Sequence, residues 1–460
     1  MLELHLELPP GRGRRAAIEA ALRDAVRAGR LQPGTRLPSS RSLASDLGVS
    51  RSTVVEAYQQ LTAEGFLTSQ QGDGTAVAAV RPTESAEPDD DLLGPNPTWD
   101  FRPGEPDASS FPAREWRRSV RHALEDDGHR AVTYPDPRGR PELRRSLGDY
   151  VARTRAVVAE PSSVFVYGGF AAGLGFLADT FRRIGLVRVA VEEAMLPLHR
   201  MVLRMAGLEV DVISVDVEGL VVEQLEQSEA RAVLVTPSNH YPYCVTMSPA
   251  RRAALVAWAE AVDGWIIEDD YDGEFRYDRR PIGALQSLAP HRVVYAGTAS
   301  KSLGAGLRLG WLVVPEPLRQ PLTATANLRA GVSAIDQLAL ADLIERGALD
   351  RHVRSMRRTY GERRTALIER LARDIPALTP APSQAGLHLT VPVPSPDMEA
   401  RLVAVGETND VGLLGLTGFH RAPPERAGLA IGFSRPAQHA FAVGLDRLVE
   451  VCAEVVAEFS

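Results

Sequence analysis

Short apolar segments alternate with amphipathic segments through the middle of the 460-residue chain, and this alternation limits the possible fold more than any other feature. The segments that predict strands cover residues 164–167, 187–191, 210–215, 232–236, 264–268 and 293–296. Strands that alternate with helices form a mostly parallel sheet with helices on both faces, and ligands bind at the carboxyl ends of its strands. The sequence therefore predicts an α/β domain with a site at that edge.

Lys301 follows the last of these segments and is the only lysine of the chain, because every other basic residue counted with it is arginine. Arginine stays protonated and cannot form an imine, whereas a desolvated lysine can. Lys301 lies in a Ser/Gly-rich turn between two apolar runs, 293–296 and 309–314, that read as buried strands. This position predicts a Schiff-base lysine, for which pyridoxal phosphate is the commonest partner. The alternative is a surface lysine retained by chance.

Several classes of protein are excluded by the composition. No apolar run is long enough to span a bilayer, and the N-terminus lacks the pattern of a secretion signal. Two distant cysteines, Cys244 and Cys452, give neither a disulfide framework nor a metal site with zinc spacing. We therefore expect a cytoplasmic protein without a membrane partner or a bound metal.

Positive charge is concentrated near the N-terminus, although the net charge of the whole chain is -7. Nine arginines and only three acidic residues lie between Arg12 and Arg51. Such an asymmetry indicates a basic module attached to an acidic body, as in proteins that bind nucleic acid.

The basic module has the pattern of a winged helix-turn-helix. Residues 14–29 carry a helical apolar stripe, and residues 37–47 predict a short helix that ends at Gly48. Ser50 is placed to cap a second helix, and two short strands around a Gly-Asp-Gly tip follow as a wing. Small hydroxyl residues and an arginine at the start of that helix suit contacts in the major groove. A small helical packing domain that does not bind DNA is the alternative.

This region resembles the GntR family of bacterial winged-helix regulators. The resemblance rests on Pro-Gly-Thr-Arg-Leu-Pro-Ser-Ser-Arg from Pro33 and Leu-Gly-Val-Ser-Arg from Leu47. It implies that double-stranded operator DNA is a partner. The residues that it places at phosphates and groove edges are Arg36, Ser39, Ser40 and Arg41, those at the start of the recognition helix are Ser50, Arg51, Ser52 and Thr53, and the wing tip is Gly74.

The domain boundaries follow from changes in composition. We predict a DNA-binding domain over residues 1–80, a flexible acidic linker over 81–98 and an effector domain over 99–460. Within the last of these, a smaller C-terminal subdomain is expected from about residue 346 to residue 460.

Three features near the strand ends suit a phosphorylated cofactor. The strand over 164–167 runs through a Gly-Gly turn into a helix, where backbone amides can approach a phosphate, although tight packing explains such a turn equally well. The acidic run after strand 264–268 contains a carboxylate that could pair with a pyridine nitrogen, or it is a solvated loop. Arg308 is close enough in sequence to Lys301 to bind a phosphate in the same pocket.

The effector part resembles fold-type I aminotransferases, and the whole chain resembles the MocR subfamily of GntR regulators. The strongest motifs are Glu-Asp-Asp-Tyr-Asp-Gly-Glu-Phe-Arg-Tyr from Glu268 and Gly-Thr-Ala-Ser-Lys-Ser-Leu from Gly297. By this resemblance Lys301 forms a Schiff base with pyridoxal 5'-phosphate, Asp269 faces the ring nitrogen and Tyr271 approaches the ring oxygen. The other cofactor-binding positions that it implies are Thr298, Ser300 and Arg308, the glycine turn with Gly169, Phe170 and Ala171, and the aromatic position Tyr241.

The chain departs from the family at two positions. Leu196 stands where the family places a tyrosine that stacks on the cofactor ring, and Ala430 stands where aminotransferases place the arginine that clamps the substrate carboxylate. Loss of a buried arginine–carboxylate pair costs about 2–5 kcal/mol of binding, which argues against amino-acid turnover. No residue is therefore predicted as catalytic.

The sequence as a whole predicts a homodimeric transcription regulator that binds pyridoxal phosphate and senses this vitamin or a small amine or amino-acid effector. A working aminotransferase with an accessory DNA module is the enzyme alternative. A third possibility is a degenerate scaffold that binds DNA without cofactor.

Overall fold

The computed structural model describes residues 13–27, 29–70, 74–78, 97–126, 128–278, 282–326, 331–381, 383–420 and 426–459. The chain divides into two compact units, Met1–Pro95 and Asn96–Ser460. The predicted linker lies almost wholly outside the described residues. The last residue of the predicted linker, Thr98, is described and belongs to the second unit. Its amide donates a hydrogen bond to the Asp410 carboxylate at 3.0 Å.

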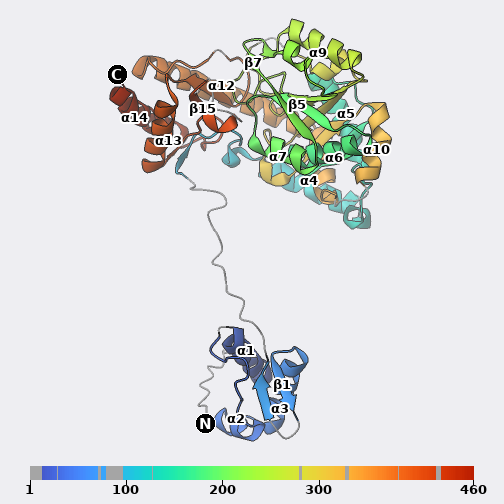
Figure 1. Cartoon of the computed structure of the whole chain (residues 1–460), viewed down its shortest axis with the longest axis vertical. Helices are drawn as coiled ribbons and strands as arrows, with labels where there is room; N and C mark the ends of the chain where they lie inside the picture. Colours follow the sequence, from blue (N-terminus) through green and yellow to red (C-terminus); the bar gives the residue numbers. More distant parts are fainter. Residues whose placement is uncertain are drawn as a thin grey trace. The chain divides into compact units, whose positions relative to one another are not determined.

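The described residues of the first unit form three helices and a two-stranded sheet (Figure 1). Its elements are α1 (Arg14–Arg27), α2 (Ser40–Asp46), α3 (Arg51–Ala63), β1 (Leu67–Gln70) and β2 (Gly74–Val77). The two strands pair antiparallel, with Leu67 opposite Val77. Apolar side chains from all three helices and both strands form its core, which includes Ile18, Leu43 and Leu61. This arrangement is the predicted winged helix-turn-helix.

Serine side chains cap the N-termini of two of these helices. The Ser50 hydroxyl accepts a hydrogen bond from the Thr53 amide at 3.2 Å and caps α3, as the sequence predicted. The Ser39 hydroxyl accepts one from the Ser42 amide at 3.2 Å and caps α2 in the same way. The tip of the wing, residues 71–73, lies outside the described residues.

The second unit is built on a seven-stranded sheet in the order β4-β12-β11-β10-β9-β5-β6 (Figure 1). The strands are β4 (Val164–Tyr167), β5 (Arg188–Glu192), β6 (Glu209–Ile213), β9 (Ala232–Val235), β10 (Trp265–Asp269), β11 (Val293–Thr298) and β12 (Gly310–Val313). All six predicted strands are present. Only β12 runs antiparallel to its neighbours β11 and β4, which makes the sheet mostly parallel.

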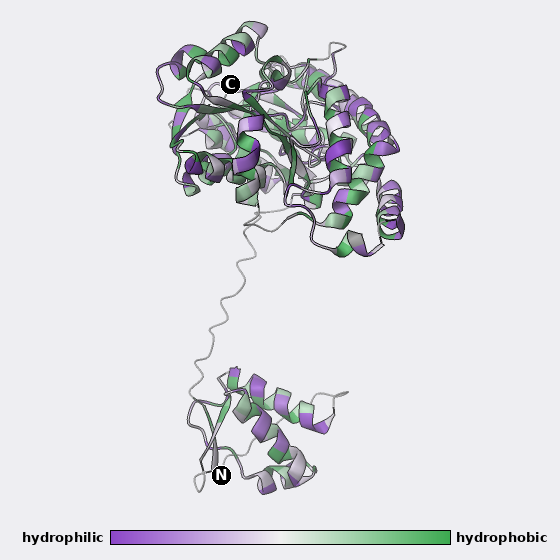
Figure 2. Cartoon of the chain, turned by 90° about the vertical axis from the view of Figure 1, so that its right-hand side faces the viewer, coloured by the Kyte–Doolittle hydropathy of each residue, from purple (hydrophilic) through white to green (hydrophobic). Residues whose placement is uncertain are grey.

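Alternate side chains of each strand pack on opposite faces of this sheet. Phe165, Val191 and Leu234 pack against one set of helices, α6 (Phe170–Arg183), α7 (Pro197–Met205) and α10 (Glu316–Ala326). Val166 and Val313 pack on the opposite face. The helices of that face are α4 (Ala113–Asp126), α5 (Pro141–Arg155), α9 (Pro249–Ala261) and α11 (Ala334–Glu345). Figure 2 shows the hydrophobic strands between helices that carry hydrophilic residues.

The C-terminal part has a separate apolar core. It contains α12 (Ala348–Asp374), α13 (Pro396–Thr408), α14 (Phe441–Phe459), β13 (His388–Pro392) and β15 (Gly428–Gly432). The segment that opens the unit packs here, because β3 (Trp99–Asp100) pairs parallel with β14 (Val411–Gly412) and Phe101 is fully buried in this core. The remaining elements are a short hairpin, β7 (Val215–Asp216) and β8 (Gly219–Leu220), and the helical turn α8 (Val222–Leu225). Of the helices in the described ranges, none is long and apolar enough to cross a membrane.

Candidate functional site

A cavity of about 160 Å³ lies at the carboxyl ends of the parallel strands, where the sequence predicted a ligand site. Its walls come from segments that are distant in sequence, since Gly104 precedes α4, Glu192 ends β5 and His388 begins β13. Lys301, Asp269 and Tyr271 line the same cavity. The structure therefore brings together the three side chains predicted at the cofactor ring.

Lys301 stands in the turn between β11 and β12, and its amine is withdrawn from solvent. The amine donates a hydrogen bond to the backbone carbonyl of Gly104. Burial lowers the pKa of Lys301 below its usual value, and the Asp269 carboxylate partly offsets this effect. A lowered pKa increases the fraction of neutral amine, which is the nucleophilic form.

Asp269 ends strand β10 and is 6% exposed. Its Oδ1 atom is buried and has no hydrogen-bond partner among the described residues. Burial raises the pKa of Asp269 well above its usual range, while the Lys301 amine acts in the opposite direction. A buried carboxyl oxygen without a partner is costly, and a protonated ring nitrogen would satisfy it. Asp269 therefore fits a pyridine ring in this cavity.

Tyr271 is held in place by the turn that follows β9. Its hydroxyl donates to the Asn239 carbonyl at 3.1 Å and accepts from the Asn239 side-chain amide at 3.2 Å. Tyr241 also lines the cavity, and its ring meets the Tyr271 ring edge-on, with centroids 6.1 Å apart. The two tyrosines predicted for the cofactor thus support each other at one wall.

Predicted phosphate-binding residues also line the cavity. Thr298 and Ser300 line it, and their hydroxyls lie 2.9 Å apart. A Cβ added to Gly169, whose φ is +91°, would lie 3.5 Å from the Arg308 guanidinium, so the absence of a side chain leaves this approach open. Gly169 and Phe170 begin α6, whose first-turn amides and dipole favour an anion.

Ala171 is the one predicted cofactor residue outside the lining of this cavity, although it belongs to the first turn of α6. Its assigned contact was a backbone amide and stays a prediction.

Both departures from the family are visible at the site. Leu196 caps the start of α7 and lines the cavity with an aliphatic side chain. Ala430 is fully buried in a small apolar cluster with Tyr243 and Phe419 and does not line the cavity. Among the described residues that line the cavity, Arg308 is the single arginine. The described lining of the cavity therefore offers no second guanidinium that could hold a substrate carboxylate.

Sequence reasoning missed four polar residues that line the cavity, Glu192, His199, Thr236 and His388. The Glu192 carboxylate accepts hydrogen bonds from the Thr236 amide at 3.0 Å and the Thr236 hydroxyl at 2.7 Å. His388 donates through Nε2 to the Pro242 carbonyl at 3.1 Å, and His199 packs against Phe170. Glu192 directly follows the apolar run of a predicted strand, so its position at a carboxyl end was the available signal.

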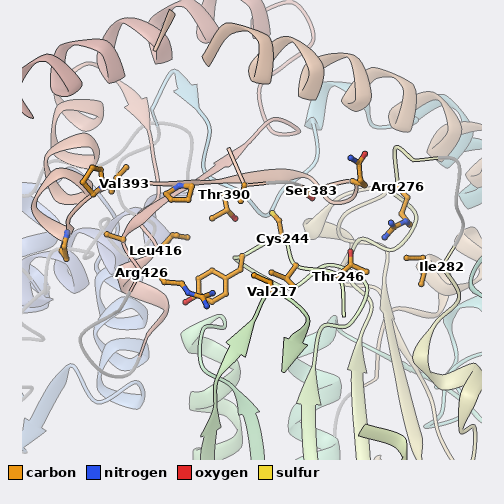
Figure 3. A pocket seen from close by; sticks show the side chains of 18 residues that line it. Val217, Cys244, Thr246, Arg276, Ile282, Ser383, Thr390, Val393, Leu416 and Arg426 are labelled. Carbon is orange, nitrogen blue, oxygen red and sulfur yellow. The ribbon is translucent and has the colours of Figure 1, made fainter. Parts of the chain in front are cut away.

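A larger groove of about 820 Å³ lies where the C-terminal part meets the sheet domain (Figure 3). The turn that contains Tyr241, which lines the smaller cavity, also contains Cys244, which lines this groove. Three polar side chains of the groove are bonded within the chain, since the Thr390, Ser383 and Thr246 hydroxyls all donate to backbone carbonyls. The smaller cavity, with its buried amine and unsatisfied carboxyl oxygen, is therefore the better candidate site.

The predicted DNA-contacting residues lie mostly at the surface of the first unit. Arg36, Arg41, Arg51 and Ser52 are exposed, as is Gly74 at the start of β2. The Arg51 Nε atom lies 3.4 Å from the Ser40 hydroxyl, so the helices α2 and α3 present their N-terminal residues side by side. The hydroxyls of Ser39 and Ser50 accept helix-capping bonds, and the Ser50 hydroxyl also lies 2.8 Å from the Ser52 hydroxyl and 2.7 Å from the Thr53 hydroxyl.

Comparison with known proteins agrees with both units. Residues 14–77 match the family of bacterial regulatory proteins of the gntR family, and residues 100–407 match aminotransferase class I and II. The pyridoxine biosynthesis transcriptional regulator PdxR of Corynebacterium glutamicum is 36% identical over 80% of both chains. The probable rhizopine catabolism regulatory protein MocR of Rhizobium meliloti is 33% identical over 80% of this chain and 79% of its own. The chain belongs to the MocR subfamily of GntR regulators.

Solved structures support the fold of the larger unit. An archaeal alanine:glyoxylate aminotransferase matches with a TM-score of 0.71 and 23% identity, over 78% of this chain and 92% of its own. As a MocR-type protein, the chain is a transcriptional regulator with a helix-turn-helix domain that binds DNA and an aminotransferase-like domain of a pyridoxal phosphate-dependent fold family.

Proposed function

We propose that this regulator binds pyridoxal 5'-phosphate covalently through Lys301 and changes its operator binding in response to this vitamin or to a small amine or amino acid. One observation carries the proposal. The only lysine of the chain and an unsatisfied buried carboxyl oxygen of Asp269 line the same cavity. Pyridoxal phosphate supplies an aldehyde that condenses with a primary amine and a ring nitrogen that withdraws electrons.

Each end of the cavity would hold a different part of the cofactor. Asp269 would bind the ring nitrogen and Tyr271 the ring oxygen, while Thr298, Ser300, Arg308 and the start of α6 would bind the phosphate. The support for this assignment is chemical, because a guanidinium, two hydroxyls and a helix N-terminus are all favourable to an anion.

Purified full-length protein with added pyridoxal phosphate provides the first test. We expect a visible absorption band, and after borohydride reduction a cofactor adduct on the peptide that contains Lys301. Lys301→Arg is the matched variant, because arginine keeps the positive charge but cannot form an imine. An adduct on another residue, or an unchanged band in Lys301→Arg, would overturn the assignment.

Sensing requires that the ligand bind two states of the protein with unequal affinity. A duplex selected by the full chain from a random-sequence library serves as the operator. We expect pyridoxal phosphate, alone or with an added amine, to change the affinity for this duplex by about 5–150-fold. Equal affinity under all these conditions would refute the sensor and leave the DNA-binding role intact.

A homodimer is part of the proposal, and we place it in the cytoplasm, where operator DNA is found. Two large side chains that are close in sequence are exposed, since Val132 is 69% exposed and Tyr134 102% exposed. Exposed large side chains of this kind suit an interface, and two half-sites of an operator match a two-fold dimer. Sedimentation of the full chain should give twice the mass of 49.8 kDa.

The enzyme alternative makes a different prediction. An aminotransferase needs to hold the substrate carboxylate, and Arg308 is assigned here to the phosphate. We therefore expect no steady transfer of amino groups from amino acids to keto acids. Sustained turnover that is lost in Lys301→Arg would establish the enzyme instead.

A further inference from the structure

One face of the cavity lacks the aromatic side chain that covers the ring in related proteins. Leu196 holds that position, is 37% exposed and carries no ring. His199 lies one helical turn further along α7 and lines the same cavity. Residues three apart on a helix share a face, so both side chains approach the cavity from one side.

The His199 ring is positioned by an aromatic contact. It meets the Phe170 ring edge-on, with centroids 4.8 Å apart and planes at 71°. Phe170 opens α6 at the predicted phosphate end of the cavity. The backbone amide of His199 donates to the Leu196 carbonyl at 3.0 Å, whereas its ring nitrogens form no hydrogen bond or ion pair with the described residues.

The environment also decides the charge of the ring. Burial, together with the smaller effect of the nearby Lys301 amine, lowers the pKa of His199 to about 4. A neutral imidazole is therefore the form present at neutral pH. A neutral aromatic ring stacks favourably on an electron-poor ring, whereas an imidazolium would repel a protonated pyridine nitrogen.

We propose that His199 replaces the missing aromatic residue and covers one face of the cofactor ring. The inference rests on the proposed binding of pyridoxal phosphate and assigns a chain-specific residue to it. His199 acts here by contact with the ring and by its flat shape. The His199 ring, one helical turn after Leu196, therefore compensates for the aliphatic side chain at that position.

The test measures the dissociation constant of pyridoxal phosphate by visible titration of full-length variants, together with the circular dichroism of the bound band. We expect His199→Ala to weaken binding about tenfold and His199→Phe to stay within about twofold of wild type. Leu196→Tyr should strengthen binding more in His199→Ala than in the wild type. It should recover most of the lost affinity in His199→Ala, a non-additivity that indicates a shared position.

Controls separate a local effect from general damage. His291→Ala changes an exposed histidine outside the cavity and should leave the dissociation constant unchanged. Thermal unfolding without cofactor checks the fold, and His199→Leu replaces His199→Ala if the smaller side chain destabilises the protein.

Two results would overturn the inference. If His199→Phe weakens binding as much as His199→Ala, the ring acts through a nitrogen and does not stack. If all variants match a wild type that forms the Lys301 adduct, His199 does not touch the cofactor. A wild type without an adduct refutes the proposed function itself, so the two failures are distinguishable.

Discussion

The Arg155 guanidinium forms a two-point ion pair with the Asp270 carboxylate, with N–O distances of 2.6 and 3.0 Å. Both side chains are almost completely buried, at 4% and 1% exposure. The same guanidinium donates to the Ser238 hydroxyl at 2.8 Å, and the Tyr295 hydroxyl donates to Asp270 at 3.0 Å. The last residue of α5 is thereby joined to β11 and to the segments that directly follow β9 and β10, next to the cavity that Asp269 lines.

We expect Asp270→Asn to destabilise the larger unit by about 3–5 kcal/mol, because the variant leaves a buried guanidinium without its counter-charge. Denaturation of the full chain in urea, followed by tryptophan fluorescence, measures the change. Glu458→Gln is the matched control, since Glu458 pairs with Arg401 at the surface and should shift the midpoint little. If Asp270→Asn unfolds at the urea midpoint of the wild type, the ion pair contributes to the specificity of the fold and not to its free energy of unfolding.

This pair also marks a limit of sequence reasoning. Asp270 was visible in an acidic run, but its partner lies 115 residues earlier. The run contains several adjacent carboxylates, and spacing alone does not tell which one faces the cavity. The strand geometry decides it, because neighbouring side chains point to opposite sides. Asp269 thus lines the cavity and Asp270 points to Arg155.

The cap at the recognition helix gives a second prediction. Ser50→Ala removes the hydroxyl that accepts from the Thr53 amide and should cost about 1 kcal/mol in the N-terminal unit. Calorimetry of the full chain should show a lower transition temperature for the N-terminal unit and an unchanged transition temperature for the second unit. Ser45→Ala, at an exposed position inside α2, is the control. Equal melting of both variants would mean that water replaces the cap without loss.

DNA contacts by Arg51 can be tested independently of stability. Arg51→Ala should weaken binding to the selected duplex and reduce the slope of log affinity against log salt by about 1, because one phosphate contact is lost. The cofactor band should remain intact. Arg114→Ala, at a highly exposed position on α4 of the other unit, should leave both the affinity and the slope unchanged. The contact is wrongly assigned if the two variants behave alike.

Local patterns predicted the elements well, because the six predicted strands of the large sheet are short and mostly apolar runs, and Ser50 stands directly before a periodic helix. The opposite direction of β12 could not be seen, since an apolar run does not encode its direction. His199 was missed for a related reason. A single histidine in a helix carries no pattern, and its role depends on Phe170, which precedes it by 29 positions in the sequence.

The pH dependence of stability tests the buried Glu192. Burial raises the pKa of Glu192 to about 8 in the folded protein, although bonds from Thr236 act in the opposite direction. The neighbouring His240 does not compensate, because burial lowers its pKa to about 3 and leaves it uncharged. The folded state therefore holds a proton that the unfolded state releases above its own pKa of about 4.5. The contribution of Glu192 is fully present below that pKa and is lost as the pH rises towards 8.

Glu192→Gln should remove this dependence, because glutamine keeps an oxygen for the Thr236 donors and does not titrate. Between about pH 4.5 and pH 8 the free energy of unfolding of wild type should fall more steeply than that of the variant, by about 1.4 kcal/mol per pH unit for one proton. Urea denaturation without cofactor at several pH values measures both slopes. Glu223→Gln, at an exposed position on α8, should keep the wild-type slope. Identical slopes for Glu192→Gln and wild type would mean that Glu192 is ionised in the folded protein at neutral pH.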